Sequence, residues 1–382
     1  MFSGTTEINS HQTSIEVHML TFFEALASNA NASRADRCDN VPMNNSLLTK
    51  SAEISDVAFG FMASKALFAA LHFGVFTHLS ERPLTAGAVA REAKIHPERA
   101  RTLLTALASI GLVSVEDGRF GNSPAAEAFL VKGAKYDFGD YLRLQVDRQM
   151  YSMLDQIELA IGNNLPEEAT TSYAEWFSDP EEARIYSASQ HSGSLGPASG
   201  LAKNVDLSNA RTLLDVGGGT GAFSITLCEA FPQLKATIVD FPTVADIGKE
   251  YVEEAGLSDR ITFIPGEALK TEWPRNQDVI LMSYLFSGVP GERHEELITR
   301  AYDHLAPAGR VLIHDFVVSA DRKGPKLAAL WQLQHTAFTP HAHSLDDGWL
   351  ADQLTSAGFA DVSVTPMIPA MTMLASGIRP GA

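Results

Sequence analysis

The stretch that decides the fold is Arg-Thr-Leu-Leu-Asp-Val-Gly-Gly-Gly-Thr-Gly-Ala, residues 211–222. The apolar run Thr212–Val216 predicts a buried parallel strand, and the alternating glycines after it predict a tight turn into a helix, Phe223–Phe231. Glycines at such a turn let the backbone approach a ligand closely, with the N-terminus of the helix beside it. The stretch therefore predicts a ligand site at the end of a strand.

A second strand and an acid follow at a spacing typical of nucleoside cofactors. The strand is predicted at Lys235–Val239 and ends in Asp240, where an acid can hold ribose hydroxyls. Gly217-x-Gly219-x-x-Ala222 matches a loose dinucleotide fingerprint, whereas Gly217-x-Gly219-x-Gly221 after Asp215 resembles motif I of the class I S-adenosylmethionine (SAM) methyltransferases. We favour SAM, because Asp215 would face its ammonium group and would be poorly placed beside a pyrophosphate.

Composition narrows the class of protein. The chain has 382 residues, 45% of them hydrophobic, which suggests two domains with large cores. The net charge of −17 argues against nucleic acid and anionic membranes as partners. Cys38 and Cys228 give no disulfide framework, no apolar run reaches membrane-spanning length, and the N-terminus does not resemble a signal peptide. We expect a cytoplasmic enzyme with a small-molecule substrate.

The chain is predicted to have three regions. Residues 1–50 read as a poorly ordered extension with a short helix at His18–Ala27, residues 51–178 as a helical and winged-helix dimerisation domain, and residues 179–382 as the SAM-binding domain. Apolar side chains recur at helical spacing over residues 51–82. Because a small winged unit cannot cover all of them, we expect a homodimer.

The winged unit is predicted within Pro83–Ala125. Its helices are Thr85–Ala93 and Pro97–Ile110, and its wing strands flank a turn at Gly118. Winged helices often bind DNA, but five basic and four acidic side chains leave this unit near neutral. We therefore expect it to serve packing or dimerisation.

Strands and helices alternate from Arg211 onward. This pattern predicts an α/β, Rossmann-like fold with a mostly parallel sheet that helices cover on both faces. A final hairpin-like pair would close the sheet. The predicted strands are Thr212–Val216, Lys235–Asp240, Ile261–Pro265, Asp278–Ser283, Arg310–Asp315, Asp361–Thr365 and Met373–Gly377.

The order of motifs over about residues 51–380 resembles the small-molecule SAM methyltransferases typified by the plant caffeic acid O-methyltransferase family and its bacterial relatives. The resemblance rests on the N-terminal winged-helix domain and on three motifs, Leu214-Asp215-Val216-Gly217-Gly218-Gly219-Thr220-Gly221, Val239-Asp240-Phe241-Pro242-x-Val244 and Pro265-Gly266-Glu267. It implies a SAM site that includes Asp215, Gly217, Gly219, Gly221, Asp240, Glu267, Ser192 and Ser283.

Two of these positions carry finer expectations. Glu267 stands where the family usually has an Asp near the adenine, and Ser192 matches a helix position that often touches the methionine part of SAM. Its neighbour His191 is either an active-site residue or a helix histidine whose hydrogen bonds are satisfied within the protein.

The chain departs from the family after the fourth strand. The O-methyltransferases carry a His-Asp pair there, and the His removes the phenol proton, but this chain has Ser287 at the His position. A serine hydroxyl is no general base at neutral pH without a partner. This departure argues against ordinary phenol O-methylation and makes Ser287 a candidate catalytic residue of another kind.

Asp315 and His335 point to another chemistry. By resemblance, both positions face the substrate, and bacterial α-keto acid C-methyltransferases hold a metal with His and Asp. A divalent metal, zinc or iron, would chelate an α-keto acid and favour its enol. The third ligand would be His191, or else His314, which could join only if the strand ends or twists there, because adjacent strand residues point to opposite faces. The alternative is a hydrogen-bond network without metal.

We therefore predict a SAM-dependent C-methyltransferase acting on the β-carbon of an α-keto acid, similar to the 5-guanidino-2-oxopentanoate type. The alternative is an O- or N-methyltransferase of a small metabolite with a displaced base. A third hypothesis is a non-enzymatic regulator with a degenerate SAM fold. The intact glycine turn and Asp240 argue against it.

Overall fold

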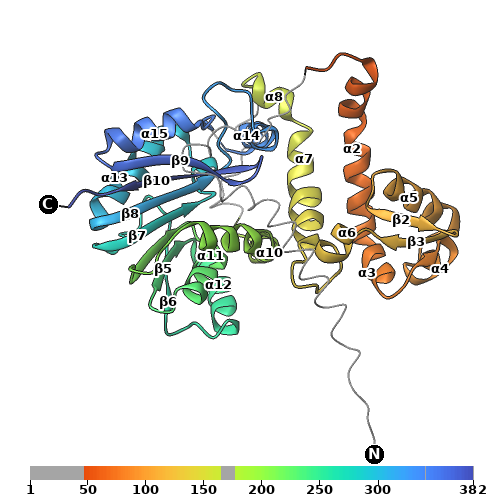
Figure 1. The fold of residues 1–382 in the computed structure, drawn as a ribbon, viewed down its shortest axis with the longest axis horizontal. Coiled ribbons are helices and arrows are strands. Elements are labelled where there is room, and N and C mark those ends of the chain that lie inside the picture. Colours follow the sequence, from red (N-terminus) through yellow and green to blue (C-terminus); the bar gives the residue numbers. More distant parts are fainter. Residues whose placement is uncertain (1–46, 165–176, 340, 382) are drawn as a thin grey trace, which may run out of the picture. The chain divides into compact units, whose positions relative to one another are not determined.

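A computed structural model describes residues 47–164, 177–339 and 341–381. The predicted N-terminal extension lies outside the described residues up to residue 46, together with the helix expected at His18–Ala27. The part of the chain that follows begins with a long apolar helix and ends in the last strand of a large sheet (Figure 1).

The long helix is α2 (Ser51–His72), followed by the short α3 (Val75–Ser80). By length and composition alone α2 is apolar enough to cross a membrane, so the prediction that no run of this length exists is wrong. One such helix is weak evidence for a membrane span. Most of its side chains are exposed, but Ala70 is buried in the core of the small domain that follows, and Phe68 is buried with its ring against that of Tyr151.

The small domain has the two helices and the wing that the sequence predicts. Thr85 and Ser123 cap the helices that follow them, because each side chain accepts a backbone N–H at an N-terminus. A three-stranded sheet pairs in the order β1-β3-β2. The elements are β1 (Leu84–Thr85), α4 (Ala86–Glu92), α5 (Pro97–Ser109), β2 (Val113–Glu116), β3 (Arg119–Asn122) and α6 (Pro124–Phe129).

Helices connect the small domain to the large sheet. A π-helical segment, η2 (Tyr141–Met150), continues into α7 (Tyr151–Leu154) and is followed by α8 (Ile157–Ile161). The long α10 (Pro180–Asn204) packs against η2 and against the sheet domain. Asp179 caps α10, and Pro180 occupies its first turn, where the missing N–H costs nothing.

The large sheet has seven strands in the order β6-β5-β4-β7-β8-β10-β9. Its first five strands in this order are parallel, and the last two close the sheet as an antiparallel pair, as predicted. The strands are β4 (Thr212–Val216), β5 (Lys235–Asp240), β6 (Ile261–Pro265), β7 (Gln277–Ser283), β8 (Leu305–Asp315), β9 (Ala360–Ile368) and β10 (Thr372–Ile378).

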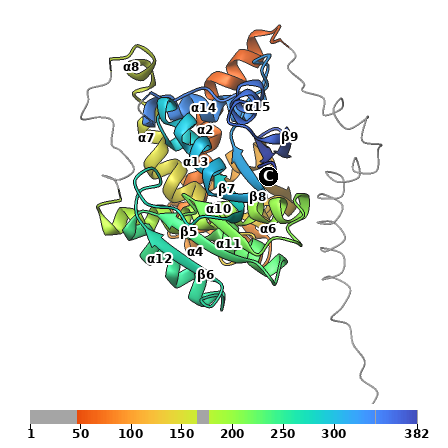
Figure 2. The same ribbon diagram turned by 90° about the vertical axis from the view of Figure 1, so that its left-hand side faces the viewer.

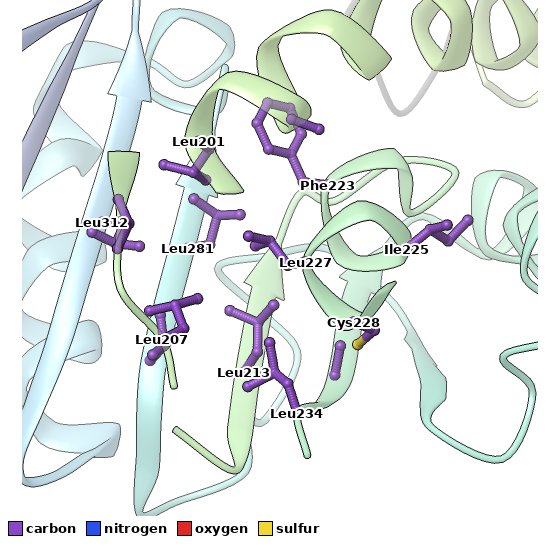
Figure 3. Close-up of a cluster of buried hydrophobic side chains, with 14 of the residues drawn as sticks. Leu201, Leu207, Leu213, Phe223, Ile225, Leu227, Cys228, Leu234, Leu281 and Leu312 are labelled. Atoms are coloured by element: carbon purple, nitrogen blue, oxygen red, sulfur yellow. The ribbon is translucent and has the colours of Figure 1, made fainter. Parts of the chain in front are cut away.

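Helices cover both faces of the sheet, as Figures 1 and 2 show. Successive residues of a strand point to opposite faces, so Leu213 packs under α10 and α11, whereas Leu214 packs under α13 and α15. Figure 3 shows the first of these two cores, to which Leu213, Leu227 and Leu281 belong. The helices are α11 (Ala222–Ala230), α12 (Pro242–Glu254), α13 (His294–His304), α14 (Lys326–Phe338) and α15 (Asp347–Ser356).

The carboxyl ends of the parallel strands meet at one edge of the sheet. Asp215, Asp240, Ser283 and Asp315 lie at or next to the last residues of four of these strands. In open α/β sheets ligands bind at this edge, in the crevice that forms where the strand order reverses. Here the order reverses at β4, next to the glycine turn.

Candidate active site

The glycine turn has the backbone that its sequence predicts. Gly217, Gly219 and Gly221 have positive φ angles of 70°, 59° and 85°. A Cβ at 217 would meet Leu285 at 3.0 Å and one at 221 would meet Ile238 at 2.9 Å, whereas a Cβ at 219 would meet no atom within 4 Å. The positive φ favours glycine at all three positions, and a side chain at 217 or 221 would in addition crowd a neighbour, whereas Gly219 faces open space.

That open space belongs to a cavity of about 480 Å³ at the carboxyl ends of the parallel strands. Its wall combines the glycine turn, the ends of β5 and β7, the loop after β6, and one face of α10. The lining residues include Tyr186, Ser187, Gln190, Ser194, Asp215, Gly217, Gly219, Thr220, Asp240, Phe241, Glu267, Lys270, Ser283, Tyr284, Leu285, Gly288, Val289, Pro290, Arg293 and Thr339.

Asp240 fixes the turn and faces the cavity. Its Oδ2 accepts a hydrogen bond from the Gly219 amide at 2.7 Å, and its Oδ1 accepts one from the Phe241 amide at 2.7 Å. Burial raises the pKa of Asp240 to about 6. A carboxylate oxygen accepts more than one hydrogen bond, so both oxygens retain capacity for ligand hydroxyls.

Asp215 presents an unused acceptor to the same cavity. Its Oδ2 accepts the Ser224 hydroxyl at 2.7 Å, while its buried Oδ1 has no partner. Burial raises the pKa of Asp215 to about 7. A buried polar atom without a partner is uncommon in a folded protein, and a cationic ligand group would satisfy this one.

Of three further residues predicted to bind SAM, Glu267 and Ser283 line the cavity and Ser192 does not. Glu267 lines the wall and pairs with Lys270 at 2.5 Å. Ser283 also lines it, with its Oγ 2.9 Å from Nδ1 of His314. Ser192 donates to the carbonyl of Ser189 at 3.0 Å and is not among the lining residues.

The cavity face of α10 was not identified from the sequence. It carries Ser187, Gln190 and Ser194, spaced three and four residues apart, and the Ser187 hydroxyl is buried without a partner. This spacing is the pattern of one helix face, so it was available in the sequence. It could not be recognised there, because small polar residues occur all around α10.

His191 is a helix histidine whose hydrogen bond is satisfied. Its Nδ1 lies 2.7 Å from the Thr220 hydroxyl, and its ring stacks on Tyr251 with 3.9 Å between centroids. Burial lowers its pKa to about 4, so the ring is neutral at pH 7. Of the two alternatives left open by the sequence, the geometry favours the structural one, because His191 contacts Thr220 of the glycine turn and is not among the residues that line the cavity.

The structure does not bring the predicted ligands His314, Asp315 and His335 together as a metal centre. His314 uses both ring nitrogens, with Nδ1 2.9 Å from Ser283 Oγ and Nε2 2.8 Å from Thr372 Oγ1. Asp315 is the next residue of β8 and points to the opposite face. Within residues 47–164, 177–339 and 341–381, no three His, Cys, Asp or Glu side chains are grouped so as to hold a metal ion.

Asp315 instead holds the short turn η4 (Phe286–Gly288) against the sheet. Its Oδ2 accepts the Ser287 amide at 3.0 Å and its Oδ1 accepts the Phe316 amide at 2.8 Å. Burial raises the pKa of Asp315 to about 6, against the opposing effect of these amides. Thr339 donates to the Ser287 carbonyl at 3.0 Å, so Ser287 is held on two sides.

His335 is buried with both ring nitrogens free. Its side chain is 8% exposed, and neither Nδ1 nor Nε2 has a hydrogen-bond partner. Burial lowers its pKa to about 4. It lies one helical turn before Thr339, which lines the cavity. His335 and Asp315 themselves are not among the residues that line it.

Tyr284 is a site residue that the sequence did not single out. It lines the cavity with a positive φ of 57°, a strained conformation for a residue with a Cβ. Its ring packs 4.6 Å from that of His314 and 5.2 Å from that of Phe316. Backbone strain that packing maintains in this way is typical of functional sites. A strained backbone conformation of this kind cannot be predicted from a sequence pattern.

Comparisons with known proteins agree with this geometry. Residues 166–360 match the O-methyltransferase domain, and residues 55–132 match the O-methyltransferase dimerisation domain. The tetracenomycin polyketide synthesis 8-O-methyl transferase of Streptomyces glaucescens is 29% identical over 86% of this chain and 96% of its own length. The L-tyrosine C(3)-methyltransferase of Streptomyces lavendulae is 27% identical over 79% of this chain and 85% of its own.

Solved structures share the fold. Human N-acetylserotonin methyltransferase in complex with SAM superposes with a TM-score of 0.77 at 23% identity, over 88% of this chain and 99% of that chain. The SAM-dependent methyltransferase SibL has a TM-score of 0.71 at 28% identity, over 87% of this chain and 100% of its own. The chain therefore belongs to the O-methyltransferase family and is a SAM-dependent methyltransferase with an N-terminal dimerisation domain.

Proposed function

We propose that the enzyme transfers a methyl group from SAM to a hydroxyl group of a small metabolite, and that His335 binds this hydroxyl without the help of a metal. The observation that carries the proposal is the buried imidazole of His335 with two unpaired nitrogens, one turn from the cavity. A neutral imidazole accepts a hydrogen bond at one nitrogen and donates one at the other. The acceptor nitrogen could therefore take a hydrogen bond from the hydroxyl group of a substrate.

The cofactor half of the proposal rests on four positions. Asp215 would receive the ammonium group of SAM at its unused Oδ1, and Asp240 would receive the ribose hydroxyls. The open space over Gly219 would admit the cofactor against the backbone, and Glu267 would lie on the adenine side. Bound SAM would supply a methyl group attached to a positively charged sulfur, and the carbon of this methyl group is the electrophile of the reaction.

His335 would also take the proton that the hydroxyl loses. With a pKa of about 4 it is a weak base for a free phenol. As the oxygen forms its bond to the methyl group, however, its proton becomes strongly acidic, and a weak, well-placed base is then sufficient. Asp315 would act as a positioning residue, because it holds the turn that carries Ser287 and touches no open space.

Relatives of this chain support transfer to oxygen, although they also include enzymes named for transfer to nitrogen and carbon. The methylation of an α-keto acid at its β-carbon, expected from the sequence, relied on three metal ligands that do not converge here. We therefore place hydroxyl methylation first and keep the α-keto acid as the competing outcome of the test. A cytoplasmic location and the absence of nucleic-acid and membrane partners stay predictions of the sequence.

The test is a substrate panel of phenols, hydroxylated aromatics and α-keto acids, each incubated with SAM and analysed by mass spectrometry with and without chelator. We expect a methylated product from a hydroxylated compound and no effect of the chelator. Product from α-keto acids alone, lost on chelation, would replace hydroxyl transfer by metal-dependent C-methylation.

The affinity for SAM is expected to increase as the pH rises towards 7. The raised pKa of Asp215 means that the free site holds a proton at pH 5 to 6, and the ammonium group of SAM must displace that proton. One displaced proton changes the Kd by at most about tenfold per pH unit. Calorimetry from pH 5 to 8 should show this slope, and Asp215→Asn should reduce it. An equal slope in that variant would exclude Asp215 as its source.

The enzyme is expected to be a homodimer. Residues 55–132 match a dimerisation domain, and α2 exposes the apolar side chains of Ile54, Val57, Phe61 and Met62. Sedimentation at micromolar concentration should give about twice the chain mass of 41.2 kDa. Phe61→Glu should shift the equilibrium to monomer, whereas Val115→Glu on the wing should leave it unchanged. A wild-type monomer would contradict the prediction.

A further inference from the structure

We propose that His294 is a positioning residue for the cofactor cavity, because it clamps the two ends of the turn that forms one wall. The wall is built by Leu285, Gly288, Val289 and Pro290. His294 is the first residue of α13, lies outside the cavity lining, and is fully buried. The inference rests on the proposed function of the cavity as the SAM site.

The clamp is a pair of hydrogen bonds from one ring nitrogen. Nε2 of His294 lies 2.9 Å from the Phe286 carbonyl and 3.1 Å from the Val289 carbonyl. Carbonyl oxygens only accept hydrogen bonds, so Nε2 must carry the hydrogen and donate it to both. Nδ1 is then the unprotonated nitrogen, and it is buried without a partner. The contacts thus select one tautomer of a neutral ring.

Aromatic neighbours hold the ring in the plane that this geometry needs. The Phe286 ring lies 4.9 Å from the His294 ring, and Trp349 and His343 meet it edge-on at 5.7 Å and 5.9 Å. Burial lowers the pKa of His294, so the ring stays neutral at pH 7. A buried Nδ1 without a hydrogen-bond partner costs free energy. The histidine is nevertheless present, and a shorter side chain could not reach both carbonyls.

His294 completes the fixation of the turn. Asp315 binds the Ser287 amide and Thr339 binds the Ser287 carbonyl, so these two hold the middle of the turn. Only His294, among the described residues, is seen to hold both the Phe286 and the Val289 carbonyl through its side chain. Without it, the middle would stay attached while Gly288, Val289 and Pro290 could move into or away from the cavity.

The test measures binding of S-adenosylhomocysteine, the demethylated product, by calorimetry. His294→Leu fills the same space without a donor and should raise the Kd about tenfold, the effect of one or two lost hydrogen bonds. His294→Gln restores an N–H donor of similar reach and should return the Kd close to the wild-type value. This rescue separates positioning from packing, since both variants lose the ring.

A matched control lies on the same helix. His304 is also buried and its Nδ1 lies 2.7 Å from the Arg300 carbonyl, but Arg300, unlike Val289, is not part of the cavity wall. His304→Leu should lower thermal stability as His294→Leu does and leave the Kd unchanged. If His294→Leu does not fold, His294→Asn, whose amide is too short for both carbonyls, should show the same weakening.

The experiment distinguishes a failure of the role of His294 from a failure of the proposed SAM site. Wild-type affinity in His294→Leu, or no rescue by His294→Gln, would overturn the role of His294. Absence of binding in the wild-type protein would instead contradict the assignment of the cavity to SAM.

Discussion

Gly219→Val is expected to abolish SAM binding while the protein still folds. A Cβ at this position meets no protein atom within 4 Å, so the valine side chain extends into the cavity and not into the core. The cofactor must approach the backbone there, next to the Asp240 carboxylate that holds the Gly219 amide. Calorimetry with SAM should therefore show no heat of binding.

Gly256→Val is the matched control for this variant. Gly256 also has a positive φ, 68° against 59° at Gly219, and a Cβ there also meets nothing within 4 Å. Both substitutions carry the same left-handed strain, roughly 1–2 kcal/mol, but Gly256 does not line the cavity. Gly256→Val should bind SAM like the wild type at a similar loss of thermal stability. Wild-type affinity in Gly219→Val would remove the turn from the cofactor site.

Asp315→Asn is expected to lower turnover about 100-fold, an effect of the size seen when a fixed polar group of an active site is lost, with SAM affinity retained. The carboxylate accepts the Ser287 amide at one oxygen and the Phe316 amide at the other. An amide side chain accepts at one position only, so its NH₂ group would face a backbone N–H. Ser287 would shift at the substrate end of the cavity, whereas His294 would still hold the Phe286 and Val289 carbonyls, so the wall that faces the cofactor would stay in place.

Asp346→Asn is the control that shows whether the loss of turnover in Asp315→Asn comes from a change in the active site or from lower stability of the fold. Asp346 is also buried and accepts a backbone amide, that of Trp349 at 2.8 Å, but it caps α15 away from the cavity. It should lower the melting temperature and leave turnover unchanged. Steady-state kinetics on the substrate found with the panel decide the comparison, and equal turnover in both variants would refute the role of Asp315.

The strands of the large sheet were predictable because a strand that is buried on both faces has a nearly continuous run of apolar residues. β4, β5 and β6 begin and end at the residues that the apolar runs indicate. The glycine turn was predictable for a similar reason, since only glycine adopts three positive φ angles so close together at low cost. These local rules place Asp215, Asp240, Glu267 and Ser283 at the cavity.

The errors arise where side-chain direction decides the outcome. His314 and Asp315 are neighbours in sequence, yet they point to opposite faces of β8, so their side chains do not converge on one site. Ser192 lies on α10 one residue from His191, but the helix turns Ser187 and Gln190 to the cavity instead. The contacts of His191 with Tyr251 and of His294 with two carbonyls join distant elements, and no local pattern encodes them.

The most direct measurement for the proposed chemistry is the position of the transferred methyl group. With SAM labelled with ¹³C in its methyl group, NMR of the product distinguishes a methyl carbon attached to oxygen from one attached to carbon. The account predicts the label on an oxygen of a hydroxylated metabolite, at a rate that a chelator does not change. A label on the β-carbon of an α-keto acid, formed only with metal present, would contradict it.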